Sequence, residues 1–261
     1  MTFWKLQRCT FLALAAIALF ASAALAQDEK NWSLDVGVDY SDHYLFRGIS
    51  VLGDNEVLVP HATFSSGNFN VYYYGYVGDI PADFTSSGNT ISYREDDFGA
   101  DYTLALTEKV GLTLGAVAYM YNDQTTNEYG AADTYELYAI AAFDVPLSPT
   151  LSYYRDMDAI KGAYASIAIS HSFPLGSKAS FDFSASVGFD FGYNLGSGTV
   201  SGLKKSNGDL NDLLVGIDIP IQVNDWLSVH AMAQQSISLD VLDDLGYKDE
   251  TVLTGGVGFT F

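Results

Sequence analysis

Apolar residues alternate with small or polar residues along most of this chain, most clearly in its final segment, 251–261. In an extended strand, Leu253, Val257 and Phe259 share one face, whereas Thr254 and Gly258 share the other. Successive side chains of a strand point to opposite faces, so one face is apolar and aromatic and the other is small or polar. This pattern favours a β-strand with an apolar environment on one side only.

Segments of the same kind recur from residue 32 to the end of the chain, which predicts an all-β protein. We expect about twelve strands, at 32–50, 57–65, 69–80, 92–106, 110–122, 134–145, 150–156, 163–173, 179–194, 212–223, 227–239 and 251–261. Roughly ten residues are enough for a tilted strand to cross a bilayer. Ten or fourteen strands remain alternatives, because two of the segments are short.

The connections between these segments alternate in length. The short ones are 66–68, 107–109, 146–149, 174–178 and 224–226, and most of the others, 51–56, 81–91, 123–133, 157–162, 195–211 and 240–250, are longer. Outer-membrane barrels have short periplasmic turns and longer outer loops. The sequence therefore predicts a single transmembrane antiparallel up-and-down β-barrel, closed by pairing of the last strand with residues 33–40.

Composition separates this prediction from a soluble β-sandwich or a soluble ligand-binding barrel, which also alternate. The chain has 18 Tyr, 16 Phe and 24 Gly but only 6 Pro, which is typical of β-structure. A soluble sandwich would carry many Lys, Glu and Arg on its water-facing side. This chain has only 12 Lys and Arg, and its polar face carries Gly, Ser, Thr and Asp. Lipid outside and water inside explain that composition better.

The amino terminus is typical of a secretory signal peptide that is cleaved after Ala26. Lys5 and Arg8 precede an apolar run that ends in small residues. The alternative is a retained membrane helix, but the run is short for a span of roughly 20 residues. We therefore divide the chain into a signal peptide, 1–26, and an outer-membrane β-barrel domain, 27–261. The single cysteine, Cys9, lies in the signal segment, so no disulfide is expected.

The net charge of −20 argues against nucleic acid and against anionic membrane surfaces as partners. It favours cations as partners, or simply soluble loops. The acidic stretches 240–244 and 249–250 are interpreted as a solvated loop rather than a calcium site. No cofactor and no metal site is predicted.

The phase of each strand assigns a set of charged residues to the lumen. The pore-lining candidates are Asp35, Asp39, Arg47, Asp97, Asp101, Glu136, Asp182, Asp190, Asp218 and His230. Most are acidic, and a ring of carboxylates concentrates cations. The alternative is that these carboxylates pair with basic residues such as Arg155 and merely fill a narrow interior.

Arg47 is predicted to continue the first strand and to face inward, because a lipid-facing charge costs roughly 2–4 kcal/mol near the midplane. Gly48 beside it would allow a bulge or a close backbone approach. Two interpretations are open. Arg47 is either a positive contact in an acidic constriction or a structural ion pair with Asp39 or Asp97.

The segment Asp39-Tyr-Ser-Asp-His-Tyr-Leu-Phe-Arg-Gly-Ile-Ser50 resembles the opening strand of the TorF-like porins, which carries a Ser-Asp-Tyr-x-Phe-Arg-Gly type of sequence. The segments 148–156, 162–164 and 170–173 are similar to a mid-chain part of such barrels. His43 and Leu45 interrupt the first motif. The resemblance implies an outer-membrane barrel of porin type and supplies neither a substrate nor functional residues.

The chain ends on Phe261, which resembles the closing strand of bacterial outer-membrane barrels. That resemblance implies that the barrel-assembly machinery reads this aromatic end. The other expected partners are outer-membrane lipid and small solutes or cations.

An outer-membrane lipid hydrolase with Ser and His on the barrel wall is a less favoured alternative. His230 and Ser228 share a face about 7 Å apart, too far for direct proton transfer, and no Gly-x-Ser-x-Gly elbow is present. A dyad between strands stays open.

The sequence thus predicts a non-enzymatic porin-like channel, in the bacterial outer membrane, for passive diffusion of small hydrophilic solutes or ions. Loop 195–211 is its candidate constriction. The main alternative is a closed barrel that acts through its loops in adhesion, envelope structure or assembly.

Overall fold

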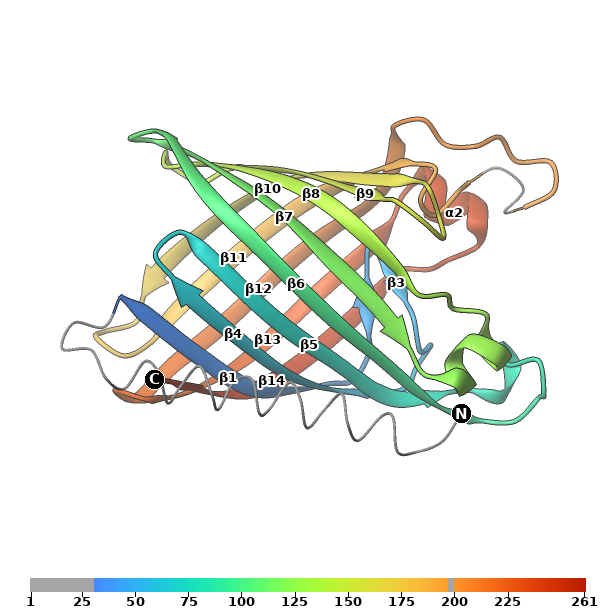
Figure 1. Ribbon diagram of the computed structural model, residues 1–261, viewed down its shortest axis with the longest axis horizontal. Helices are drawn as coiled ribbons and strands as arrows, with labels where there is room; N and C mark the ends of the chain where they lie inside the picture. The colour runs from blue at the N-terminus through green and yellow to red at the C-terminus, as the bar shows by residue number, and fades with distance from the viewer. Residues whose placement is uncertain (1–30, 197–199) are drawn as a thin grey trace.

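Twelve antiparallel strands close into one barrel, in the order β1-β14-β13-β12-β11-β10-β9-β8-β7-β6-β5-β4 (Figure 1). The structure is a computed structural model that describes residues 31–196 and 200–261. The predicted fold class and strand number are therefore confirmed. The signal peptide predicted for residues 1–26 lies outside the described residues.

Each predicted strand corresponds to one barrel strand. The barrel strands are β1 (Trp32–Ser41), β4 (Val57–Ser66), β5 (Phe69–Ile80), β6 (Ile91–Thr107), β7 (Val110–Tyr121), β8 (Thr134–Phe143), β9 (Thr150–Asp156), β10 (Ala163–Pro174), β11 (Ser180–Phe191), β12 (Asp209–Asn224), β13 (Leu227–Ser238) and β14 (Glu250–Thr260). The alternation of side chains identified these strands because every one of them separates two unlike environments.

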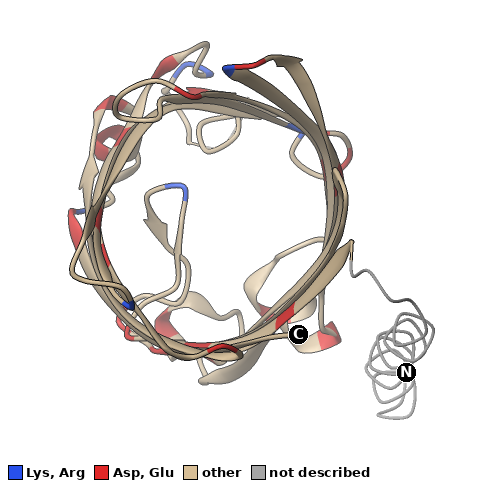
Figure 2. Cartoon of the chain, turned by 90° about the vertical axis from the view of Figure 1, so that its left-hand side faces the viewer, with Lys and Arg blue, Asp and Glu red and all other residues tan. Residues whose placement is uncertain are grey.

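The first strand is shorter than predicted. β1 ends at Ser41, and residues 42–56 then carry a small hairpin, β2 (Leu45–Phe46) paired with β3 (Ile49–Ser50). Figure 2 shows a hairpin projecting into the interior of the ring of strands. The prediction that Arg47 lies on the barrel wall is therefore wrong.

The turn of this hairpin explains the error. Arg47 and Gly48 have φ angles of 50° and 83°, and together they reverse the chain between β2 and β3. Two consecutive residues with positive φ make the type I′ turn that suits the twist of a hairpin. The alternation runs on through such a turn, so the pattern alone reads as one continuous strand.

β1 and β14 close the barrel, as predicted. Asp35 pairs with Thr260 and Asp39 with Gly256 in their register. The backbone N–H of Phe261 donates to the carbonyl of Leu34 at 2.9 Å, and that of Leu34 donates back at 3.1 Å. The last residue is therefore part of the seam.

The two faces of the barrel differ in chemistry. In β6, Tyr102 and Leu104 are 48% and 40% exposed on the outside, whereas Glu95 and Asp97, on the opposite face, are 3% and 6% exposed. Other large apolar side chains exposed on the outer face include Leu58, Val71, Leu114, Leu137, Leu151, Ile167, Ile219 and Leu253. The outer face is thus largely apolar, although the ion pair of Arg94 with Asp96 has the outer phase of β6, and the inner face carries buried carboxyl groups.

The longer connections gather at one end of the barrel (Figure 1). They carry the hairpin and three short helices, η1 (Ala82–Phe84), η2 (Thr125–Tyr129) and α2 (Asp240–Leu245). The short turns and the carboxyl terminus lie at the other end. Within the described residues, no helix is long and apolar enough to cross a membrane.

Candidate functional site

A bidentate ion pair between Arg47 and Glu136 fastens the hairpin tip inside the barrel. Nη1 of Arg47 donates to Oε1 of Glu136 at 2.8 Å, and Nη2 donates to Oε2 at 2.7 Å. The two side chains are 7% and 0% exposed. The hydroxyl of Tyr119 also donates to Glu136, at 3.0 Å. Since β8, which carries Glu136, neighbours neither β1 nor β4, this contact crosses the lumen.

Aromatic rings surround the same guanidinium. Cζ of Arg47 lies 4.0 Å from the ring centroid of Tyr193 and 5.1 Å from those of Tyr154 and Tyr164. Such contacts stabilise a cation by about 0.5–2 kcal/mol each. We call Glu136, Tyr119, Tyr154, Tyr164 and Tyr193 the guanidinium box. The hairpin's own Phe46 adds a further ring at 4.8 Å.

The charge of Arg47 is secure in this position. Burial by itself lowers the pKa of Arg47, but the neighbouring Tyr193 and the carboxylate of Glu136 outweigh burial and raise the pKa above its ordinary value. The pair is therefore a true ion pair. Its partner is neither Asp39 nor Asp97, so both of the partners expected from the sequence were wrong.

Gly48, next to Arg47, lies so close to neighbouring side chains that a Cβ atom would clash with them. A Cβ atom there would lie 2.6 Å from Leu242 of α2 and 2.7 Å from Cβ of Asp212 in β12. Its φ of 83° is also one that side-chain-bearing residues rarely adopt. The hairpin tip is thus packed closely against α2 and β12.

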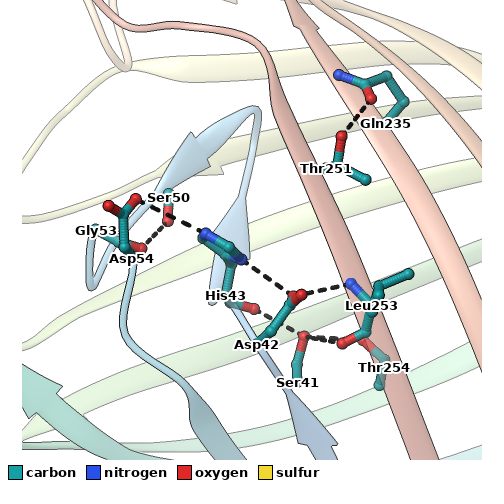
Figure 3. A network of polar contacts seen from close by, with 10 residues as sticks. All are labelled: Ser41, Asp42, His43, Ser50, Gly53, Asp54, Gln235, Thr251, Leu253 and Thr254. Atoms are coloured by element: carbon teal, nitrogen blue, oxygen red, sulfur yellow. Dashed lines mark hydrogen bonds and ion pairs between the residues drawn. The ribbon is translucent and has the colours of Figure 1, made fainter.

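The root of the hairpin is tied to β14 by a polar network (Figure 3). Oδ1 of Asp42 accepts the backbone N–H of Leu253 at 2.8 Å and lies 3.0 Å from Nδ1 of His43. Nε2 of His43 lies 3.8 Å from Asp54, at the other end of the segment. Ser41 donates to the carbonyl of His43 at 2.8 Å. These contacts fix the direction in which the chain leaves β1.

Between root and tip, the segment fills the outer part of the lumen with aromatic side chains. Tyr44 stacks on Tyr76, with ring centroids 4.2 Å apart. Its hydroxyl donates to Glu95 at 3.1 Å, and the hydroxyl of Tyr121 donates to the same carboxylate at 3.2 Å. The buried cluster here comprises Tyr44, Leu52, Val57, Val59, Ile80, Ile91 and Tyr93. The segment is therefore a packed plug, defined here as residues 42–56.

A second polar cluster brings three of the predicted residues together. Nε2 of His230 lies 3.1 Å from Asp39, and its Nδ1 lies 3.0 Å from Asp218. Asp182 is opposite Asp218 in the register of β11 and β12. Both ring nitrogens of His230 are engaged by carboxylates, which leaves neither of them for Ser228. The geometry does not form the Ser–His dyad weighed from the sequence.

The remaining predicted residues occupy separate places. Asp35 accepts a hydrogen bond from Thr260 at 2.6 Å, and Asp101 accepts one from Tyr138 at 2.9 Å. Asp190 is fully buried. Its oxygens accept backbone N–H groups of residues 192–195, so Asp190 shapes the loop after β11. Asp97 lies beside Glu95 on the inner face of β6.

The segment that narrows the lumen is the plug, residues 42–56, and not loop 195–211, which was the predicted constriction. Residues 197–199 of this loop lie outside the described part. Tyr193, just before it, stacks on Arg47, and Asn211, at its end, donates to the Arg47 carbonyl at 2.9 Å. The residues that flank this loop therefore hold Arg47 of the plug in place.

Sequence reasoning missed most of the guanidinium box. Glu136 was a candidate, but Tyr119, Tyr154, Tyr164 and Tyr193 were not, although all four lie in segments that were predicted to be strands. A signal existed in the strand phase, since Tyr154 and Tyr164 face each other in the register of β9 and β10. Glu95 was missed as well, although it is in phase with Asp97.

Comparison with known proteins identifies the fold but not a family. No family model matches the chain, and no curated protein matches it. The KdgM porin has the same fold, with a TM-score of 0.53 and 9% identity over 88% of this chain and 99% of that chain. The KdgM porin in complex with disordered oligogalacturonate gives the same values.

A third solved structure, the COG4313 outer membrane channel from Pseudomonas putida F1, has a TM-score of 0.54 and 9% identity, covering 90% of this chain and 97% of that chain. At such identities, the likeness shows the fold alone. The resemblance to the TorF-like porins finds no support from a family model and stays a prediction.

Proposed function

We propose that this chain is a porin-like channel of the bacterial outer membrane, through which small hydrophilic solutes or cations diffuse passively along an acid-lined lumen. The observation that carries the proposal is the closed barrel with large apolar side chains outside and carboxylates inside. A closed barrel satisfies every backbone group without an edge, which lipid demands. Export by a cleaved signal peptide, 1–26, belongs to the same proposal.

The size of the barrel and its plug favour a narrow channel. Twelve strands give an interior between that of a filled eight-stranded barrel and that of an open sixteen-stranded pore. The plug takes up part of this interior at the end with the long loops. We therefore expect small unitary conductance.

Charge supports cations rather than anions as solutes. Asp35, Asp39, Asp101, Asp182 and Asp218 share the inner face, and the guanidinium of Arg47 is already neutralised by Glu136. Carboxylates along a pore attract cations and repel anions. Oligogalacturonate, present in one similar porin, is an anionic sugar chain, so this lumen argues against that solute class here.

The test is conductance of the refolded protein in planar bilayers. We expect unitary current steps and, in a KCl gradient, a reversal potential that indicates preference for K⁺. Asp39→Asn combined with Asp218→Asn should lower this preference, whereas Asp144→Asn, on an exposed residue between β8 and β9, should not. Anion selectivity of the unaltered protein would refute the acid-lined channel.

The plug also favours a second candidate, a closed barrel that acts through its outer loops. The bidentate contact of Arg47 with Glu136 holds the plug across the lumen. If correctly folded protein gives no current steps, and a variant without the plug also gives none, the closed barrel is the better description.

A further inference from the structure

The barrel wall and the residue after β11 form the guanidinium box, but the guanidinium inside it belongs to Arg47 of the hairpin. Tyr119, Glu136, Tyr154 and Tyr164 belong to β7, β8, β9 and β10, and Tyr193 follows β11. The guanidinium that they surround is carried by a hairpin that leaves the barrel between β1 and β4. The wall therefore presents a complete cation site into the lumen, and the plug fills it.

The box has the chemistry that recognises a guanidinium group. Glu136 accepts two parallel N–H bonds, the fork geometry that a planar guanidinium offers and a compact ammonium group does not. Tyr119 orients the carboxylate, and Tyr164 is oriented in turn by Asp212, to which it donates at 2.9 Å. The box is thus held in shape by contacts on the wall itself.

The backbone conformation of Arg47 indicates that this residue is present for its side-chain contacts and not because it favours the turn. Arg47 adopts a φ of 50°, in a region that residues other than glycine occupy only at a cost in free energy. Asn followed by Gly is the preferred pair for a type I′ turn. An arginine here is locally unfavourable, and the contacts of its guanidinium offset that cost.

Polar contacts outside the box are few at the tip. Asn211 donates to the carbonyl of Arg47 at 2.9 Å, and Ser236 lies 3.5 Å from the carbonyl of Gly48. The β2–β3 ladder has only two residue pairs. The guanidinium box therefore supplies the charged contacts of the tip, beside the close packing of Gly48 on Leu242 and Asp212.

Carboxylates exceed cations around this part of the lumen. Asp97 is 6% exposed, and its Oδ1 has no hydrogen-bond partner within residues 31–196 and 200–261. Glu95 lies beside Asp97, and Asp97 is within electrostatic range of Glu136. The box is therefore flanked by further carboxyl groups on the inner face of β6.

We propose that the guanidinium box is a binding site for solutes that carry a guanidinium group, and that Arg47 occupies it in place of such a solute. A guanidinium solute that enters the box displaces Arg47 and frees the hairpin tip. The passage of that solute rests on the proposed channel function, whereas binding in the box does not.

The decisive variant is Arg47→Asn, which empties the box while keeping a favoured Asn-Gly turn. Methylguanidinium, the size of the missing group, is titrated into the refolded variant and followed by calorimetry. We expect binding at least about tenfold tighter than to the unaltered protein, in which Arg47 competes. Methylammonium should bind the variant more weakly, because it cannot make the fork contact.

The matched control is Arg47→Asn with Glu136→Gln, which removes the anionic half of the site. Equal binding of methylguanidinium to the single and double variants would overturn the proposal, and so would no binding to a single variant whose gel mobility shows a folded barrel. If the single variant misfolds, Arg47→Gly replaces it, since glycine also accepts the positive φ.

Planar-bilayer currents separate the two proposals. Binding of methylguanidinium by a protein that gives no current supports the box and refutes the channel. Cation currents from a variant that does not bind methylguanidinium support the channel and refute the box.

Discussion

The ion pair between Arg47 and Glu136 governs the interior of this barrel at the scale of single residues. Both side chains are buried, so each needs the other to offset the loss of water. Removal of one partner from such a pair is far more harmful than replacement of both by apolar groups. The pair therefore fixes where the plug lies more than it adds net stability.

Glu136→Gln should lower the free energy of unfolding by about 3–5 kcal/mol, because it leaves the Arg47 charge buried without its counter-ion. The measurement is denaturant unfolding of the refolded protein in micelles or vesicles. Arg47→Met with Glu136→Leu should lose much less, since no charge is left unpaired. Equal losses would show that packing, not charge, is what the pair contributes.

Asp42, at the root of the plug, makes the stability of the fold depend on pH. Burial raises the pKa of Asp42, but the backbone N–H of Leu253 and the ring of His43 outweigh it and lower the pKa below its ordinary value. A carboxylate with a lowered pKa stabilises the fold above its unfolded-state pKa, and this contribution is lost as the pH falls through the folded-state pKa.

We therefore expect the unaltered protein to lose stability below about pH 4, and Asp42→Asn to lose less over that range. Thermal unfolding followed at several pH values measures both. Asp144→Asn is the control, because Asp144 is exposed and lies outside this network. The same acid-induced loss in Asp42→Asn as in the unaltered protein would contradict this assignment.

At the scale of elements, the plug is the one described segment between barrel strands that turns inward and spans the lumen. Its root is bonded to β14, its middle packs on β5 and β6, and its tip reaches β8. It carries apolar side chains such as Tyr44 and Leu52, which are buried only when the segment is inside. Burial of this surface explains why it folds inward.

Replacement of residues 43–54 by a short Gly-Ser linker should increase the unitary conductance at least about twofold, because the plug narrows an interior of intermediate size. Planar-bilayer recordings measure this. Replacement of residues 175–178, an exposed short turn between β10 and β11, by Gly and Ser is the control and should leave the conductance unchanged. Identical conductance with and without the plug would mean that the narrowest point lies elsewhere.

At the scale of the whole molecule, the seam between β1 and β14 decides whether the barrel is closed. Seven residue pairs join the two strands, and Phe261 extends the seam by exchanging two backbone hydrogen bonds with Leu34. We also propose that the barrel-assembly machinery recognises this final strand. On this proposal, closure and recognition involve the same end of the chain.

Deletion of Phe261 should reduce the amount of folded barrel in the outer membrane of cells more than it reduces spontaneous folding into lipid vesicles. The physical reason is that two backbone bonds are a small part of the barrel, whereas a recognition residue is needed at every assembly event. The heat-dependent gel mobility of the barrel measures folding in both settings. Leu104→Ala, on the outer face, is the control; equal losses in cells and in vesicles would exclude a role in recognition.

The amino-acid pattern alone predicts the barrel, about twelve strands and the inward phase of residues such as Asp39, Asp218 and Glu136. Alternation is a local property, written into each strand by the two environments that it separates. The pairing of β1 with β14 could also be predicted, because the first and last strands of a closed barrel must meet.

The contents of the lumen, in contrast, could be learned only from the folded protein. Arg47 and Glu136 are 89 residues apart in the chain, and no local pattern pairs one buried charge with one of several carboxylates. The plug was read as strand because a hairpin keeps the same alternation as the strand before it. The contents of a lumen depend on contacts between side chains from many strands. These contacts form only after the barrel has closed.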